Sequence, residues 1–159
     1  MVMKLLITVL VIFLAGLLMI VFAIFYNNLP LTSPPGFRER LKIYLTTNIA
    51  ETSPDALLPE LQIRIYPDDG EALYNASIRA VESLGWEIAS QDMDQGKIHA
   101  LVTTPLWSFL DDVAIRILQG NGTHYAVYLR SSSRKGRGDL GTNSRHIMDF
   151  YRALERHLQ

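Results

Sequence analysis

The sequence predicts an α+β protein with a single N-terminal transmembrane helix followed by a two-layer domain, in which two helices cover one face of an antiparallel sheet of about five strands. Three observations predict this class. Residues 5–26 carry no charge, the remainder has the composition of a soluble domain, and beyond residue 60 strand-like alternation and helical spacing follow one another. The 159 residues suffice for one such domain once the apolar segment is subtracted.

The apolar segment from Leu5 to Tyr26 has 22 residues. At about 1.5 Å per residue such a helix is roughly 33 Å long, and the hydrocarbon core of a bilayer is about 30 Å thick. A cleaved signal peptide is the alternative, but no Ala-x-Ala site follows and no cysteine is available for a lipoprotein anchor. We therefore expect residues 1–26 to remain attached, with the lipid bilayer as a partner through residues 5 to 26.

The orientation in the membrane has two interpretations. Only Lys4 and the amino terminus precede the span, whereas Arg38, Arg40 and Lys42 follow it, so the positive-inside rule taken literally places the domain in the cytoplasm. A short basic leader before a long apolar run is, however, how signal anchors begin, and a sizeable trailing domain is translocated largely regardless of its charge. We favour a single-pass protein of the cell membrane with its domain on the exterior, periplasmic or lumenal, side.

Charge and composition exclude several classes of function. The 15 Lys and Arg residues against 16 Asp and Glu residues give a formal charge of -1, so we expect no nucleic-acid partner. The absence of cysteine excludes disulfides, a thiol nucleophile and a thiolate metal site. The four histidines share no ligand spacing, so we expect no metal site and no cofactor.

Residues 27–58 connect the span to the domain. Prolines at positions 30, 34 and 35 predict a stiff extended linker, and helical spacing of the apolar residues behind them predicts an amphipathic helix of about three turns. This helix is either interfacial, with Arg38, Arg40 and Lys42 toward lipid headgroups, or packed on the α+β domain that we assign to residues 59–159.

Within the domain the expected order is strand, helix, four strands, helix. The apolar pattern and the turn residues place strands at 61–66, 86–91, 97–104, 112–119 and 123–132, and helices at 71–84 and 143–158. Sequential strands joined by short turns pair antiparallel, and helices with one apolar face each can cover one side of the sheet.

The last two strands allow a prediction of register. Val113, Ile115 and Ile117 share one strand face, as do Val127 and Leu129. Both sets face the core only if paired positions sum to an even number. A two-residue turn at the Asn-Gly pair would give an odd sum, so we predict an odd loop of three or five residues with a bulge, despite that turn signal.

In the same register Arg116 and Arg130 leave the core face and can meet on the opposite face. Arg130 opens a segment of 14 residues that runs to Asn143 and joins a strand end, a glycine-rich loop and a helix start. Arginine forks, serine hydroxyls and the free N–H groups of a helix start suit phosphate, carboxylate or sulfate. The candidate residues for binding an anion or a partner are Arg116, Arg130, Ser132, Arg134 and Asn143.

A structural role is the alternative for the same segment. The arginines can pair with acidic neighbours in an ion network that fixes the loop and the helix, with no ligand. The candidate members of this network are Asp111, Asp112, Asp139, Gly136, Gly138 and Gly141; Asp139 and Asn143 can also cap the helix. Both hypotheses place the arginines near carboxylates, but only a binding site leaves guanidinium groups uncompensated.

These pieces carry a resemblance to a known family. The run Asp111-Asp112-Val-Ala-Ile-Arg116, the segment Arg130 to Asn143 and the upstream Gly85-Trp86 pair resemble the signature of the domain-of-unknown-function 1499 family. The resemblance covers roughly Pro59 to the C-terminus. It implies a small domain often found behind an export segment in bacteria and in plastid proteins, and it implies no established activity.

We interpret the chain as a non-catalytic binding or accessory protein that presents the arginine surface to a membrane or envelope protein complex. The alternative is binding of a small anionic ligand or lipid headgroup at the same face. A hydrolase-like enzyme using Asp111 or Asp112 is a third hypothesis, which is disfavoured because adjacent strand residues point to opposite faces. We assign no catalytic residue.

Overall fold

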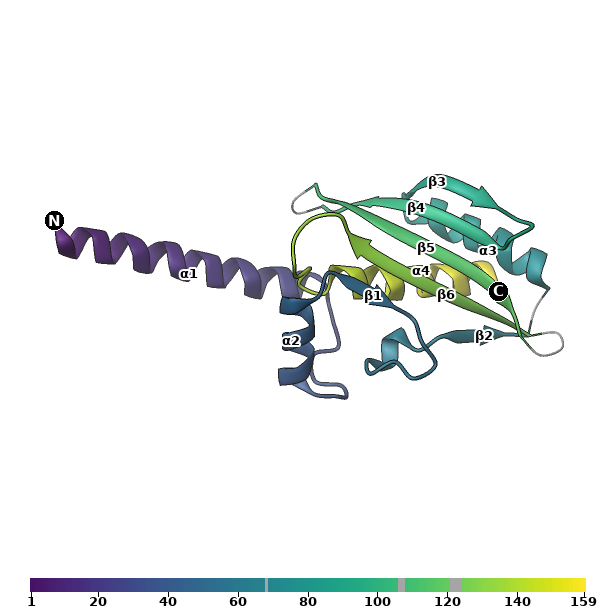
Figure 1. Ribbon diagram of the computed structural model, residues 1–159, viewed down its shortest axis with the longest axis horizontal. Coiled ribbons are helices and arrows are strands. Elements are labelled where there is room, and N and C mark those ends of the chain that lie inside the picture. The colour runs from purple at the N-terminus through teal and green to yellow at the C-terminus, as the bar shows by residue number, and fades with distance from the viewer. Residues whose placement is uncertain (68, 106–107, 121–123) are drawn as a thin grey trace.

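The computed structural model describes residues 1–67, 69–105, 108–120 and 124–159. Its elements follow one another as labelled in Figure 1: α1 (Val2–Tyr26), α2 (Phe37–Thr46), β1 (Ile49–Glu51), the 3₁₀ turn η1 (Pro59–Leu61), β2 (Arg64–Tyr66), α3 (Gly70–Ser83), β3 (Glu87–Asp92), β4 (Lys97–Thr103), β5 (Leu110–Gln119), β6 (Tyr125–Ser133) and α4 (Thr142–His157).

The domain has two layers, a six-stranded antiparallel sheet and a pair of helices. The strand order is β1-β6-β5-β4-β3, and β2 pairs with β6 beside β1. Figure 1 shows α3 and α4 behind the sheet, so one sheet face is covered and the other, here named the open face, is not. The α+β class and the two-layer arrangement are confirmed, and the additional strand is β1.

The core lies between the sheet and the two helices. Alternate residues of the central strands point into it, as does one side of each helix. Its fully buried members include Ala76, Ala80, Val81, Val113, Ile115, Val127, Leu129, Ile147, Phe150, Tyr151 and Leu154. Because odd-numbered positions of β5 face this core, the even-numbered positions face outward.

The register of β5 and β6 confirms the even-sum prediction. Ile115 pairs with Leu129 and Ile117 pairs with Val127, which places both apolar sets on the core face. The last pair, Gln119 with Tyr125, encloses a loop of odd length, although the predicted bulge falls on residues 121–123, which lie outside the described part of the chain.

Helix α2 packs on the domain through a buried arginine. The Arg40 side chain is 0% exposed and forms a bidentate ion pair with Glu60, with 2.9 Å between Nη2 and Oε2. Its guanidinium also donates to the carbonyl oxygens of Ser33 and Pro34 and to the Tyr44 hydroxyl. Arg40 therefore cannot face lipid headgroups, and of the two interpretations of this helix its burial favours packing on the domain.

Helix α1 extends away from the domain along the long axis of the molecule (Figure 1). It is 25 residues long, with a mean hydropathy of 3.2 over its most apolar window, and that window is unburied. Its length and composition suffice for crossing a membrane. Its last turn packs on the domain, where Ala23, Ile24 and the following Asn27 are buried.

The segment between span and domain is packed into the fold. Leu29 lies in the core, and β1, which precedes residue 59, belongs to the sheet. The sheet takes β1 from residues 27–58 and its other strands from residues 59–159. The division of the chain between residues 58 and 59 stays a prediction.

Replacing Arg40 with alanine should destabilise the protein strongly. The variant leaves the Glu60 carboxylate partly buried without its cation, a loss of about 3–5 kcal/mol. Arg38→Ala, in the same helix at an exposed position, should cost no more than about 0.5 kcal/mol. Denaturant unfolding of the full-length protein in detergent measures both, and equal losses would contradict the assigned role of Arg40.

Candidate functional site

A pocket of about 140 Å³ lies where α1 meets the domain. We call it the junction pocket. Its walls are the end of α1, the start of β5, the end of β6 and the glycine-rich loop of residues 134–141. None of the arginines proposed from the sequence lines it; the basic residue at its wall is Lys135.

Asp111 is the unusual residue of this pocket. Its side chain is 1% exposed, and neither carboxylate oxygen has a hydrogen-bond partner of normal geometry among the described residues. Burial raises the pKa of Asp111, and the charges of Asp139 and Asp112 raise it further. The nearby Ser133 hydroxyl opposes this rise without reaching either oxygen in normal hydrogen-bond geometry.

His146 does not supply the missing counter-charge. Its Nδ1 lies 3.9 Å from Asp111 Oδ2 and 3.2 Å from the Ser131 hydroxyl, and its ring packs edge-on against Trp86 at 5.6 Å. Burial lowers the pKa of His146 to about 4, so the imidazole is neutral at physiological pH. The Asp111 carboxylate consequently has a neutral neighbour rather than an ion-pair partner.

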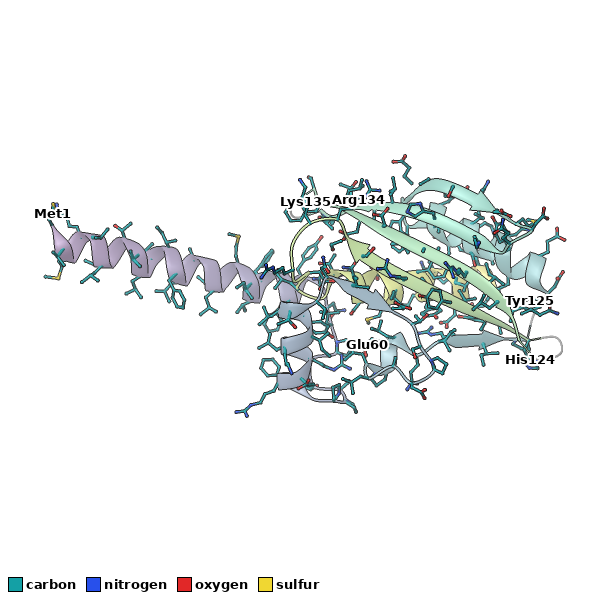
Figure 2. The ribbon with its side chains drawn as sticks, viewed as in Figure 1. Met1, Glu60, His124, Tyr125, Arg134 and Lys135 are labelled. Atoms are coloured by element: carbon teal, nitrogen blue, oxygen red, sulfur yellow. The ribbon has the colours of Figure 1, made fainter. Side chains whose placement is uncertain are left out.

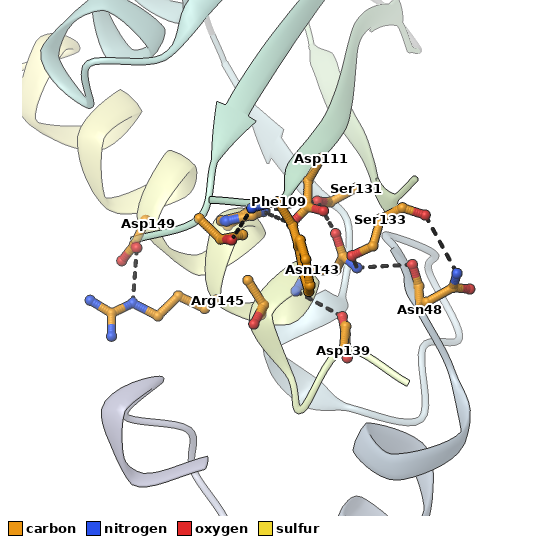
Figure 3. Close-up of polar contacts among 12 residues, drawn as sticks. Asn48, Phe109, Asp111, Ser131, Ser133, Asp139, Asn143, Arg145 and Asp149 are labelled. Atoms are coloured by element: carbon orange, nitrogen blue, oxygen red, sulfur yellow. Dashed lines mark hydrogen bonds and ion pairs between the residues drawn. The ribbon is translucent and has the colours of Figure 1, made fainter. Parts of the chain in front are cut away.

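The glycine-rich loop is fixed to the start of α4 (Figure 3). The Asp139 carboxylate accepts hydrogen bonds from the N–H groups of Gly141, at 2.8 Å, and Asn143, at 2.9 Å. Gly136 and Gly141 have φ angles of 89° and 84°, which side-chain-bearing residues rarely adopt. Because Asp139 occupies these N–H groups, this helix start offers them to no external anion.

Asn143 connects the helix to the sheet instead of capping it. Its Oδ1 accepts from the Ser131 hydroxyl at 2.6 Å, and its Nδ2 donates to the Asn48 carbonyl and the Ser133 hydroxyl, each at 2.9 Å. The side chain is fully buried. Asn143 therefore lies on the covered side of the sheet, away from the arginines with which it was grouped.

The three arginines do share the open face. Arg134 forms a bidentate pair with Asp112 at 2.7 and 2.8 Å. Arg130 donates to the Ser132 hydroxyl at 3.2 Å and lies 3.8 Å from the Glu51 carboxylate. These two guanidinium groups are thus compensated.

Arg116 differs from the other two arginines. It lies opposite Tyr128, with its guanidinium carbon 6.0 Å from the ring centroid. In the described ranges no carboxylate lies within ion-pair distance of it. Its side chain is exposed, so its positive charge is open to solvent.

Adjacent carboxylates of β5 have opposite surroundings. Asp111 faces the junction pocket, whereas Asp112 faces outward and contacts Arg134 and His99. The hydrogen bonds from Arg134, reinforced by His99, lower the pKa of Asp112 to about 2. Since the two carboxylates lie on opposite faces, they do not form a catalytic pair.

Sequence reasoning missed the polar cluster around Asp111. The even-sum register that was used for the arginines also pairs Asp111 with Ser133 and Val113 with Ser131, on the covered side. A carboxylate and two hydroxyls at positions that face the core were the available signal. Whether Asp111 has a hydrogen-bond partner depends also on Asn143 and His146. These two residues lie on α4, and the strand pattern does not predict where they meet the sheet.

A family model described as a protein of unknown function, DUF1499, matches residues 30–154. The chain belongs to the DUF1499 family. The match starts well before Pro59 and includes α2 and β1, in agreement with their packing on the sheet. It contains Asp111 and the whole loop, but not α1. No curated protein matches the chain.

In this DUF1499 domain, Gly138 and Gly136 should respond differently to alanine. A Cβ on Gly138 would lie 2.3 Å from the Leu45 carbonyl oxygen, so the loop would have to move off α2, at a cost of about 2–3 kcal/mol. At Gly136 the nearest atom is 3.5 Å away and only the positive φ is strained, at about 1 kcal/mol. Thermal unfolding measures the loss of stability in both variants. A loss in Gly136→Ala equal to or larger than that in Gly138→Ala would refute the close contact between Gly138 and α2.

The ion pair on the open face of the DUF1499 domain can be tested by titration. Arg134→Gln should raise the pKa of Asp112 from about 2 toward its ordinary value of 3.8, as followed by NMR of the side-chain carboxyl carbon. Because the native pKa is depressed, the ion pair favours the folded state above pH 3.8 and is lost as the pH falls through about 2. Arg137→Gln, in the same loop, should leave the pKa unchanged; a shift in both variants or in neither would contradict the pairing.

Proposed function

We propose that this DUF1499 protein is a membrane-anchored, non-catalytic binding or accessory protein whose open face contacts a protein partner in a membrane or envelope complex. The observation that carries the proposal is the uncompensated Arg116 at the centre of an uncovered sheet face. Exposed arginine beside tyrosine is typical of protein interfaces, which are enriched in both.

The charge pattern of the open face favours a protein over a small anion. Paired acids and bases, Glu51 with Arg130 and Asp112 with Arg134, follow the Arg116–Tyr128 pair toward the start of β5. Such alternating charges give complementarity to a structured surface, whereas an anion site concentrates positive charge. We therefore assign the orientation of the protein partner to the compensated ion pairs, and most of the binding affinity to Arg116.

The direction of α1 supports a partner in the same membrane. Figure 1 shows β5 and β6 running roughly along the direction of α1, so the open face stands beside the axis of the span. The soluble part of a neighbouring membrane protein could lie along it. We place the domain on the exterior side of the cell membrane, as proposed from the sequence.

A hollow on the same face supports the alternative of an anionic ligand. It has a volume of about 430 Å³ and is lined by Lys97, His99 and Arg116, of which Lys97 and Arg116 are cross-strand neighbours. A phosphate or carboxylate there would meet two cations. Inorganic phosphate that displaces a bound protein would favour this second function.

Charge reversal at Arg116 tests the proposal. Arg116→Glu should lower the recovery of a co-purifying membrane protein about ten-fold or more after gentle solubilisation of native membranes, because interface arginines often carry much of the binding energy. Arg79→Glu, an exposed arginine on α3 behind the sheet, is the matched control.

Quantitative mass spectrometry of tagged variants provides the measurement. Loss of the partner with Arg116→Glu alone supports the open face as the contact. An undiminished partner in Arg116→Glu, or its loss in both variants, would show that the contact lies elsewhere.

A further inference from the structure

The junction pocket lies where the apolar span ends. Tyr26 and Asn27 at the end of α1 form part of its wall. If α1 crosses a bilayer, this level coincides with the lipid headgroups. Figure 2 shows Lys135 at the end of the sheet nearer to α1, with His124 and Tyr125 at the far end.

The pocket carries an excess of negative charge. Two carboxylates, Asp111 and Asp139, face a single base, Lys135. The Asp139 oxygens accept hydrogen bonds from the helix start, so Asp111 is the carboxylate that lacks a donor. A buried carboxylate without a donor or counter-charge costs several kcal/mol, which a cationic donor in the pocket would remove.

Among the described residues, no side chain around the carboxylate fills this role. The Ser131 hydroxyl donates to Asn143, and the Asn143 amide donates to Asn48 and Ser133. The Ser133 hydroxyl reaches neither oxygen of Asp111 in normal hydrogen-bond geometry, and His146 is neutral. Of the nearby titratable groups, Asp139 shares the pocket and Asp112 lies on the opposite sheet face, and both are acidic. Lys135 lies at the pocket wall, but in the described structure it forms no ion pair with Asp111. Within the described part of the chain the carboxylate therefore has no donor, and a ligand in the pocket could supply one.

We propose that the junction pocket binds the headgroup of an aminophospholipid of the phosphoethanolamine class, with its primary ammonium on Asp111 and its phosphate toward Lys135. The pocket volume of about 140 Å³ suits a headgroup and not a whole lipid, so the acyl chains remain beside α1. Apolar wall residues, among them Ala23, Phe109 and Leu140, suit the glycerol region.

The donor requirement distinguishes between headgroups. A primary ammonium offers three N–H donors to the two orphaned oxygens, whereas the quaternary ammonium of choline offers none. Phosphatidylethanolamine should therefore bind in preference to phosphatidylcholine. The site is separate from the open face, so it can be tested independently of the proposed protein contact.

Native mass spectrometry of full-length protein from nanodiscs with equal amounts of the two lipids measures this preference. The wild-type protein should retain phosphatidylethanolamine about ten-fold over phosphatidylcholine, the ratio expected for one desolvated charged hydrogen bond. Asp111→Asn should abolish the preference. Asp112→Asn, the neighbouring carboxylate on the open face, is the matched control and should retain it.

A second variant keeps the test decisive if Asp111→Asn does not fold. Lys135→Gln changes an exposed side chain and removes a contact to the phosphate that both lipids share. The total lipid retained should fall while the ratio of the two lipids stays near the wild-type value. Equal retention of the two lipids by the wild-type protein, or loss of the preference in Asp112→Asn alone, would overturn the proposal.

Discussion

The contact between the last turn of α1 and the first turn of α4 determines how the domain stands relative to the span. Asn27 donates to the Leu140 carbonyl at 3.0 Å and to the Thr142 hydroxyl at 3.2 Å, and Arg145 donates to the Tyr26 carbonyl at 2.6 Å. The bond from Arg145 satisfies the Tyr26 carbonyl, one of the groups at the end of α1 that a helix leaves without an internal partner. The domain is consequently fixed to the span, and the glycine-rich loop lies beside the point where the span ends.

The junction requires unusually small residues in the loop. A Cβ on Gly141 would lie 2.1 Å from Leu29, and one on Gly138 would collide with the backbone of α2. Close packing of this loop creates both the rigidity of the junction and the enclosed surroundings of Asp111. The packing of the glycine-rich loop that stabilises the junction with α1 therefore also encloses the Asp111 carboxylate, which lacks a hydrogen-bond donor.

Local pattern was sufficient to predict the faces of the sheet but not the partners of its charged groups. The alternation of β5 and β6 predicted that Arg116 and Arg130 share the open face, because strand periodicity fixes side-chain direction. It did not predict β1, whose three residues, Ile-Ala-Glu, are too few to show a strand pattern in the sequence. The burial of Arg40 likewise depends on Glu60, twenty residues away, and no local spacing encodes that pair.

The two faces of the sheet carry opposite chemistry. Arg116 leaves an uncompensated positive charge on the open face, whereas Asp111 leaves an uncompensated carboxyl group on the covered side. The anion chemistry expected from the sequence at the start of α4 is excluded there by Asp139, which already occupies its N–H groups. The protein contact proposed for the open face and the headgroup site proposed at the junction thus rest on different residues.

In a bilayer that α1 spans, we expect the α1–α4 contact to hold the glycine-rich loop at the lipid surface. The chain has no cysteine, so single spin labels can be placed at Lys135→Cys, beside the junction, and at His124→Cys, at the far end of the sheet. Power-saturation EPR in nanodiscs, with oxygen and a water-soluble nickel complex as relaxers, measures the depth of each label. We expect headgroup depth for the label at residue 135 and bulk water for the label at residue 124; bulk water at both positions would show that the loop does not lie at the lipid surface.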